Sequence, residues 1–138
     1  MGTKLNPYIN FKDNTRAAME FYQSVFGGKL TISTFKEFQA SEDSSEDDKI
    51  MHSELEAENG MVFMAADTPS QMEYRPGTNF SMSLSGGDQA ELTAYFEKLS
   101  VGGTVTQPLT QAPWGDTFGM LIDKFEITWL VNIAGKKE

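Results

Sequence analysis

The sequence predicts an α+β fold in which two similar modules, each ordered strand–helix–strand–strand–strand, make up a single domain of 138 residues. Two stretches have the apolar spacing of an amphipathic helix, and each ends in a pair of glycines. They lie about 74 residues apart, and each follows one short apolar stretch and precedes three more. A repeat of this length in so short a chain indicates a duplicated module rather than a solenoid.

The first module is expected over residues 4–67. Asn14 is expected to cap its helix, because a side-chain oxygen at that position accepts a hydrogen bond from the first turn. The apolar helix positions are Ala18, Phe21, Tyr22 and Val25, and Gly27-Gly28 ends the helix. Strands are expected in PYINF, KLTISTF and IMHSELEAENGMVFMAAD, the last of which contains the hairpin dipeptide Asn59-Gly60.

The second module is expected over residues 79–134. Its helix is expected to begin at the N-cap Asp88, with Glu91 three residues later as in a capping box, and to end at Gly102-Gly103. Its strands are expected in FSMSL, TVTQPL, DTFGMLI and EITWLVN. The last two are apolar on both faces, which is typical of a sheet covered by helices outside and enclosing a pocket inside.

Two segments fall outside the repeat. Residues 40–49, ASEDSSEDDK, form an acidic loop between strands, and residues 68–78 form a linker between the modules. The acidic loop lacks the spaced ligands and central glycine of a calcium-binding loop, so we expect a solvated loop without metal.

Composition and charge exclude several classes of function. The net charge of −9 argues against binding to nucleic-acid phosphates or to anionic membranes. The absence of cysteine excludes disulfides, thiolate catalysis and sulfur-ligated metals. Because the sequence has no signal-like apolar stretch, we expect a soluble cytoplasmic protein. Its expected partners are a small hydrophobic or amphipathic molecule and a second copy of the chain.

The chain resembles a known family over nearly its whole length. The segments that carry the likeness are PYINF, AMEFYQSVFGG, MHSELE, GGTVTQPL and WGDTFGMLIDKFEITWLVN. They resemble the PhnB-like family of the vicinal oxygen chelate superfamily, also called the glyoxalase/bleomycin-resistance/dioxygenase fold. The resemblance implies two βαβββ modules whose curved mixed sheets form a cup, and it implies a homodimer. The family's turn D-P-F-G reads DKFE here, which places Glu126 where a positive φ is required.

The resemblance also bears on cofactors. Metal-dependent members of the superfamily hold a divalent ion at positions that correspond to Pro7, Met64, Ser81 and Leu130, none of which suits a transition metal. With one histidine and no cysteine, the sequence predicts no metal cofactor. PhnB-like proteins are often labelled demethylubiquinone methyltransferases. FSMSLSGGDQAEL does not support that label, because the third glycine of a dinucleotide fingerprint is missing.

His52 and Glu54 are the candidate catalytic residues. Strand alternation in IMHSELEAE puts them on one face, expected to look into the cup, and puts Met51 and Leu55 on the other, toward the helices. The pair is suited to general-base chemistry with an orienting carboxylate. Hydrogen bonding to a ligand and a purely structural polar strand are the alternatives.

Aromatic residues near the second module's last strands are the other pocket candidates. Trp114 lies between Pro113 and Gly115 in an expected loop and is predicted at the pocket rim, with core packing or a dimer contact as alternatives. Asp116 is expected to add polarity at the mouth, and Phe118 and Met64 to line the pocket. Trp129 is expected either to line the pocket or to lie in the core.

These observations predict a PhnB-like protein that binds a small molecule without a transition metal. Isomerase- or lyase-type chemistry through His52 is compatible with this prediction. The alternatives are a metal-dependent glyoxalase- or dioxygenase-type enzyme and a dimeric interaction module without a ligand.

Overall fold

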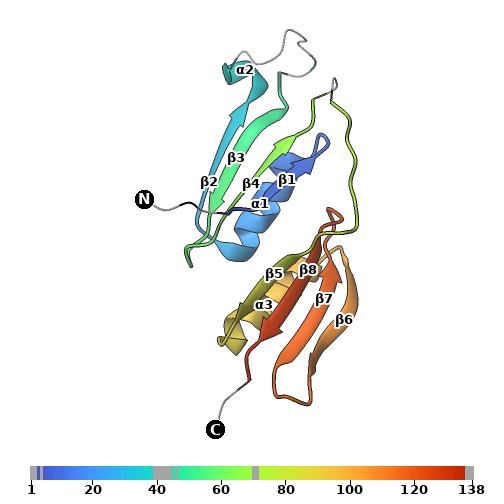
Figure 1. The fold of residues 1–138 in the computed structure, drawn as a ribbon. Helices are drawn as coiled ribbons and strands as arrows, with labels where there is room; N and C mark the ends of the chain where they lie inside the picture. The colour runs from blue at the N-terminus through green and yellow to red at the C-terminus, as the bar shows by residue number, and fades with distance from the viewer. Residues whose placement is uncertain (1–2, 4, 39–44, 46, 70–71, 136–138) are drawn as a thin grey trace. The chain divides into compact units, whose positions relative to one another are not determined.

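The computed structural model describes residues 3, 5–38, 45, 47–69 and 72–135 (Figure 1). The chain divides into two compact units, Met1–Pro76 and Gly77–Glu138, and the division falls inside the predicted linker of residues 68–78. Most of the predicted acidic loop of residues 40–49 lies outside the described residues. No helix in the described part of the chain is long and apolar enough to cross a membrane.

Both units repeat one topology. The first unit contains β1 (Tyr8–Phe11), α1 (Thr15–Phe26), β2 (Lys29–Thr34), α2 (Phe35–Phe38), β3 (Ile50–Glu56) and β4 (Val62–Asp67), and the second contains β5 (Met82–Gly86), α3 (Gln89–Ser100), β6 (Thr104–Gln111), β7 (Thr117–Ile122) and β8 (Thr128–Ile133). In the first unit the sheet order is β1-β4-β3-β2, with β1 and β4 parallel and the other neighbours antiparallel. In the second unit the order is β5-β8-β7-β6, with β5 and β8 parallel. The predicted α+β fold with two mixed sheets is therefore confirmed.

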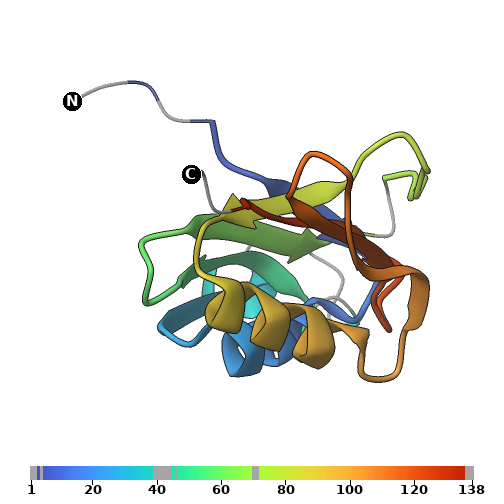
Figure 2. The same cartoon turned by 90° about the horizontal axis from the view of Figure 1, so that it is seen from below.

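Helix α1 covers one face of the first sheet, as Figure 2 shows. Its rings Tyr22 and Phe26 both meet Phe63 of β4, at centroid distances of 5.6 Å and 6.0 Å with steep interplanar angles. Edge-to-face pairs of this kind add to the free energy gained by burying apolar area. Leu55 of β3 is fully buried on the same face. The strand positions that alternate with Phe63 and Leu55 therefore lie on the opposite face of the sheet.

Helix α3 packs on the second sheet in the same way. The buried side chains Leu121, Trp129 and Val131 occupy neighbouring register positions, and Gly119 lies in the same row as Val131. A Cβ at Gly119 would lie 2.8 Å from a ring carbon of Phe96, so the missing side chain lets α3 approach the sheet closely.

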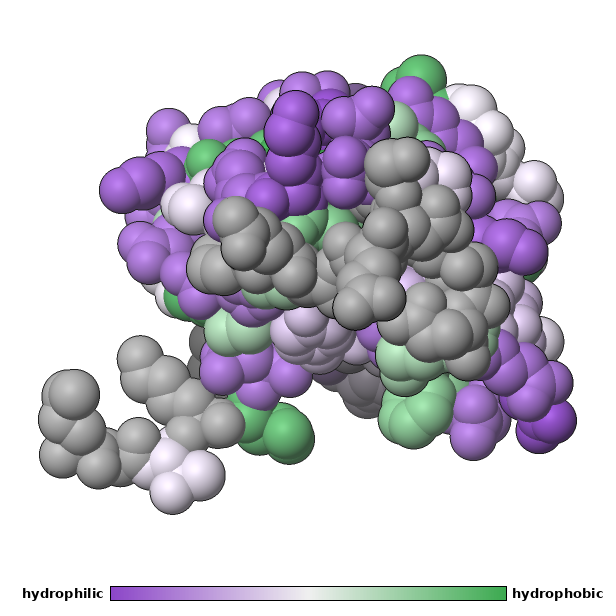
Figure 3. All heavy atoms as spheres, turned by 90° about the horizontal axis from the view of Figure 1, so that it is seen from above, coloured by the Kyte–Doolittle hydropathy of each residue, from purple (hydrophilic) through white to green (hydrophobic). Residues whose placement is uncertain are grey.

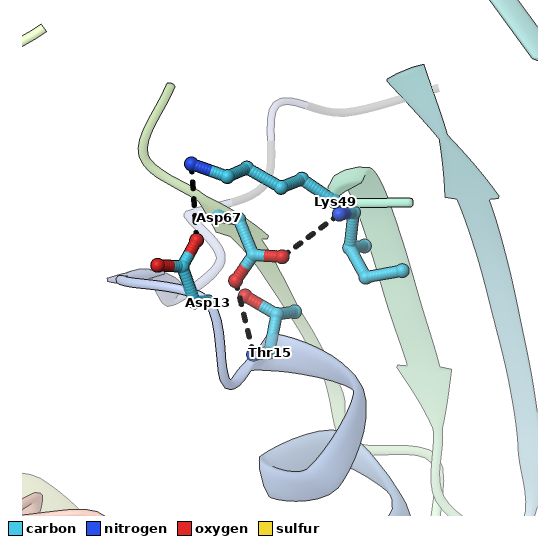
Figure 4. A network of polar contacts seen from close by, with 5 residues as sticks. Asp13, Thr15, Lys49 and Asp67 are labelled. Carbon is cyan, nitrogen blue, oxygen red and sulfur yellow. Dashed lines mark hydrogen bonds and ion pairs between the residues drawn. The ribbon is translucent and has the colours of Figure 1, made fainter. Parts of the chain in front are cut away.

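The sequence did not predict how helix α1 begins. Asn14 occupies the predicted N-cap position, but its side chain makes no capping hydrogen bond. The backbone N–H of Thr15 instead donates to Oδ1 of Asp67, 3.0 Å away, while the N–H of Ile50 donates to Oδ2 at 2.8 Å (Figure 4). One buried carboxylate at the end of β4 thus joins the start of α1 to the start of β3. In α3 the predicted cap is present, because Asp88 accepts from the N–H of Glu91 at 3.0 Å.

Candidate functional site

The candidate site begins on the face of the first sheet opposite α1. Tyr8 and Asn10 of β1 pair in register with Met64 and Ala66 of β4, and Glu54 of β3 pairs with Met64 on its other side. These residues, with His52 of β3, define what we call the strand-face cluster: Tyr8, Asn10, His52, Glu54, Met64 and Ala66. Residues paired across a sheet point to the same side, and i and i+2 on one strand do so as well. The cluster thus combines polar groups with two apolar side chains on one rigid surface.

Tyr8 and His52 are in contact within this cluster. The hydroxyl oxygen of Tyr8 lies 3.3 Å from Nδ1 of His52, and the two ring centroids are 5.9 Å apart. The strands that carry them, β1 and β3, are not neighbours, because β4 lies between them. Burial raises the pKa of Tyr8 above its usual value of 10.0, since the charged phenolate is poorly solvated there. The phenol therefore keeps its proton at physiological pH.

His52 and Glu54 share a face of β3, as the alternation predicts. Both are half-buried, and Glu54 has Met64 on one side and Thr31 on the other. An imidazole offers one donor and one acceptor when neutral, and a carboxylate offers acceptors only. The arrangement can hydrogen-bond a polar ligand group while Met64 contacts its apolar part.

A pocket of about 380 Å³ lies at the end of β1 and β4, in the size range of small-molecule sites. Asn10 and Ala66 belong to both the pocket and the strand-face cluster, so the two adjoin. At the rim, Glu73 and Arg75 form an exposed ion pair of 2.7 Å. We call this the end pocket, and its lining residues are Asn10, Phe35, Met51, Ala66, Asp67, Thr68, Pro69, Met72, Glu73, Tyr74 and Arg75.

A β-bulge explains why Met51 lines the end pocket. Ser33 pairs with His52 but Thr34 pairs with Ile50, so Met51 is skipped in the ladder. As a result Ile50, and not Met51, is buried, at 1% exposure. Both Met51 and Leu55 were expected to face the helices. Leu55 is buried there, whereas Met51 lines the end pocket, because the bulge interrupts the alternation along β3.

Four predicted pocket residues lie in the second unit. Trp114 is 76% exposed, in a turn where Gly115 has a φ of 106°. Asp116 accepts hydrogen bonds from the side-chain amide of Asn132 at 3.1 Å and from the N–H of Gly135 at 2.8 Å. Phe118 pairs with Asn132. Asp116 therefore fixes the end of β8.

Trp129 lies on the face of the second sheet that α3 covers. It is 1% exposed, and its indole N–H donates to Asp123 at 2.8 Å. The ring of Trp129 therefore lies in the core of the second unit. By contrast Phe118 lies on the face opposite α3, because it alternates along β7 with Gly119 and Leu121.

The structure groups His52, Glu54 and Met64 together and adds two residues that sequence reasoning missed. Tyr8 and Asn10 alternate in PYINF, which was a usable signal that they share a face. What the sequence did not signal is that β1 pairs with β4, which brings Tyr8 beside His52 across the sheet.

The strand positions implied for a metal do not fit one. Pro7 accepts a backbone hydrogen bond from Met64 at 3.0 Å, and Met64 and Leu130 offer only a thioether and an alkyl group. In the described ranges no three His, Cys, Asp or Glu side chains are close enough to hold an ion. The chemistry of these donors does not match a divalent transition metal.

Hydrophilic residues dominate the surface seen in Figure 3, where apolar residues occur only in small patches. This agrees with the net charge of −9. Exposed large apolar side chains include Phe80 at 85% and Met72 at 62%, and Met72 lines the end pocket. Isolated exposed apolar residues are common and need no explanation, whereas one that borders a pocket is available to a ligand.

Comparisons with known proteins agree over nearly the full chain. A family model described as "3-demethylubiquinone-9 3-methyltransferase" matches residues 3–132. Protein YjdN of Escherichia coli strain K12 is 26% identical, over 94% of this chain and 95% of its own. The crystal structure of protein PA1353 from Pseudomonas aeruginosa is similar with a TM-score of 0.81 and 32% identity, covering 98% of this chain and 100% of that one.

Two further structures extend the comparison. The PhnB protein from Bacillus cereus, which carries the same methyltransferase description, has a TM-score of 0.75 and 24% identity, over 96% of this chain and 100% of that one. A glyoxalase/bleomycin resistance protein/dioxygenase family enzyme from Burkholderia phytofirmans PsJN has a TM-score of 0.59 at 14% identity, over 91% and 95% of the two chains. At these identities the likeness concerns the fold alone.

Proposed function

Because the chain belongs to the family described as 3-demethylubiquinone-9 3-methyltransferase, a PhnB-like family of the glyoxalase/bleomycin resistance/dioxygenase superfamily, we propose that it binds a small amphipathic molecule without a transition metal. The polar part of the ligand contacts the strand-face cluster. Its apolar part enters the end pocket.

One observation carries this proposal: the cluster and the pocket are continuous through Asn10 and Ala66. Tyr8 and Met64 lie two residues before them on the same strands, about 6–7 Å along the same face. A ligand of modest length therefore reaches from the Tyr8–His52 contact into the pocket of about 380 Å³. Sites for small molecules combine such an apolar cavity with a few fixed polar groups.

The pocket lining favours an adaptable apolar contact. Met51, Met72 and Phe35 supply flexible or flat surfaces, and methionine adjusts easily to the shape of a ligand. The carboxylate of Asp67 already accepts two backbone hydrogen bonds. The charges of Glu73 and Arg75 balance each other in their ion pair. An uncharged apolar group is therefore the preferred occupant.

No step of this proposal involves a metal, because Pro7, Met64 and Leu130 offer no suitable donor and because no three His, Cys, Asp or Glu side chains of the described residues lie close enough to hold an ion. Methyl transfer, which the family's description names, would need a methyl donor. The proposed ligand site does not depend on such a donor, so S-adenosylmethionine serves as a separate arm in the binding experiment. Saturable binding of S-adenosylmethionine in competition with the apolar probe would replace the present proposal with the methyltransferase one.

The binding experiment uses the neutral dye Nile red, whose fluorescence rises in apolar surroundings. Substitution of Met72→Asp replaces an apolar contact at the pocket with a charged one and should weaken binding about tenfold or more, since a bound apolar dye would cover the carboxylate and exclude water from it. Phe80→Asp is the matched control, because Phe80 is also exposed but does not line the pocket. Equal dye affinity of the two variants, or no binding by the unmodified chain, would refute the proposal.

We also propose that the protein acts as a homodimer, as the resemblance to its family implies. Trp114 supports this because so large an exposed ring on a turn is a suitable contact for a second copy. Light scattering of the unmodified chain and of Trp114→Ser tests the proposal. Two monomeric samples would contradict it, whereas a dimer that Trp114→Ser weakens would place Trp114 at the interface.

A further inference from the structure

The contact between Tyr8 and His52 has a direct consequence for the imidazole. A neutral imidazole carries one proton, on either Nδ1 or Nε2, and the nitrogen without it is an acceptor. The contact of 3.3 Å involves Nδ1. Either the Tyr8 hydroxyl donates to Nδ1, which leaves the proton on Nε2, or Nδ1–H donates to the phenol oxygen. The hydrogen bond that one ring nitrogen makes decides which tautomer is present.

The chemistry of the two groups favours the first arrangement. A phenol is a good donor and a poor acceptor, whereas an unprotonated imidazole nitrogen is a strong acceptor. Tyr8 also keeps its proton, because burial raises its pKa. These properties favour donation from the Tyr8 hydroxyl to Nδ1, an arrangement that leaves the proton of the neutral ring on Nε2.

We propose that Tyr8 positions His52 with its proton on Nε2, so that the strand-face cluster offers its ligand one donor, Nε2–H, beside one acceptor, the Glu54 carboxylate. This inference rests on the proposed ligand site and names its substrate class. His52 and Glu54 are two residues apart on one strand face, about 6–7 Å at the backbone. A ligand group that satisfies both has an acceptor oxygen close to an O–H or N–H donor.

The negative charge near His52 narrows the proposed class of ligand further. Glu54 and Glu56 follow His52 on the same strand face, and the whole chain carries a net charge of −9. An anionic ligand would be repelled there, because like charges at short range disfavour each other. The proposed ligand is an uncharged amphipathic molecule with a carbonyl oxygen and a neighbouring hydroxyl or amide N–H. His52 is then a hydrogen-bond donor to the ligand and not a general base toward it.

The position of the proton can be measured without any ligand. His52 is the single histidine of the chain, so one pair of imidazole nitrogen resonances reports it directly by nuclear magnetic resonance. In the neutral ring, Nε2 should give a protonated and Nδ1 an unprotonated shift. Tyr8→Phe should move the Nδ1 resonance and mix the two tautomers, whereas the control Tyr74→Phe should change neither. A protonated Nδ1, or a Tyr8→Phe spectrum identical to that of the unmodified chain, would overturn the proposal.

The ligand class is tested with three probes of similar shape. Benzamide has both a carbonyl oxygen and an N–H donor, acetophenone has only the carbonyl, and benzoate is an anion. Benzamide should bind about tenfold more tightly than acetophenone, the effect of one hydrogen bond to a charged acceptor, and benzoate should bind weakest. Glu54→Ala should bring benzamide to the level of acetophenone and leave acetophenone unchanged.

The two parts of the experiment separate this inference from the proposed function. If benzamide and acetophenone bind equally, or benzoate binds best, the assigned ligand class is wrong even when Nile red confirms a ligand site. If no probe and no dye binds, the proposed function fails and the ligand class with it. The proton position of His52 is then still decided by the resonances of the unliganded chain.

Discussion

The buried carboxylate of Asp123 accepts the indole N–H of Trp129 at 2.8 Å, and its other oxygen accepts the backbone N–H groups of Phe125 and Ile127 at 2.8 Å and 3.1 Å. Asp123 is 2% exposed. One side chain therefore joins the turn between β7 and β8 to the ring at the centre of the second core. A charged acceptor that satisfies three donors at once is expensive to remove.

Asp123→Asn should lower the free energy of unfolding by about 2–4 kcal/mol, because one oxygen becomes a donor that faces other donors. Urea denaturation of this variant, of Trp129→Phe and of the double variant forms a complete cycle. The pair should show a coupling energy of about 1–3 kcal/mol. Purely additive effects would mean that the indole bond does not contribute.

Glu126→Gly should stabilise the protein. Glu126 has a φ of 70°, the left-handed region that the departure from the family's turn predicted, and this conformation costs a non-glycine residue about 1 kcal/mol. The gain in unfolding free energy should approach that value in a thermal or chemical melt. Lys124→Gly in the same turn is the control, since Lys124 is not at positive φ and should only lose stability.

Gly28→Ala and Gly103→Ala should each prevent stable folding or cost more than about 3 kcal/mol, because overpacking against backbone cannot be relieved by a rotamer change. The two glycines occupy equivalent places after α1 and α3. A Cβ would collide with the carbonyl oxygen of Glu56 at the first and of Ile122 at the second. Gly87→Ala is the control, since nothing lies within 4 Å of a Cβ there. Circular dichroism melts of the three variants should separate the pair from the control.

The two helix starts should respond differently to alanine. Asp88→Ala removes a side-chain cap from α3 and should cost about 1 kcal/mol. Asn14→Ala should cost less than about 0.5 kcal/mol, since Asn14 does not cap α1. Asp67→Ala should cost the most, because it leaves the buried N–H groups of Thr15 and Ile50 without their acceptor. A larger effect for Asn14 than for Asp67 in urea melts would contradict this account.

Stability should fall at alkaline pH through Tyr8. Its pKa is raised by burial, so the folded state holds the phenol proton more tightly than the unfolded state. The contribution is fully present below about pH 10, the pKa of an unfolded tyrosine, and is lost as the pH rises through the folded pKa. Tyr8→Phe should make the alkaline decline shallower, while Tyr74→Phe keeps it. If the unmodified chain, Tyr8→Phe and Tyr74→Phe all lose stability equally as the pH rises, Tyr8 has no role in the alkaline decline.

The repeated architecture could be predicted from the sequence, because the apolar spacing of the helices and the residues typical of caps and turns indicate the same element boundaries. The helix pattern that placed Tyr22 in the core and the Asp88 cap both hold in the structure. The prediction failed where distant residues replace local signals. Asp67 supplies the acceptor expected from Asn14, although 52 residues separate it from Thr15. Phe35, expected to continue a strand, is buried in the short helix α2 instead.

In the candidate site, too, the features that depend on local sequence were predictable and those that depend on distant pairing were not. Alternation placed His52 and Glu54 on one face, because that depends only on the strand itself. The contact of His52 with Tyr8 depends on a parallel pairing between the first and last strands of the unit. The bulge that turns Met51 toward the end pocket likewise arises from pairing with β2. Neither the parallel pairing nor the bulge can be predicted from the residues that neighbour it in the sequence.

The parallel pairing of β1 with β4 also sets an order for folding during synthesis. Tyr8 and Met64 are partners, so β1 cannot join its sheet until almost the entire first unit has left the ribosome. Until then the apolar Phe11 has no site in which to be buried. Pairing between strands so far apart in the sequence slows formation of the sheet. Until the sheet forms, an unpaired apolar strand is exposed and can aggregate with other chains. Because β5 waits for β8 in the same way, the nascent protein passes through this vulnerable stage twice.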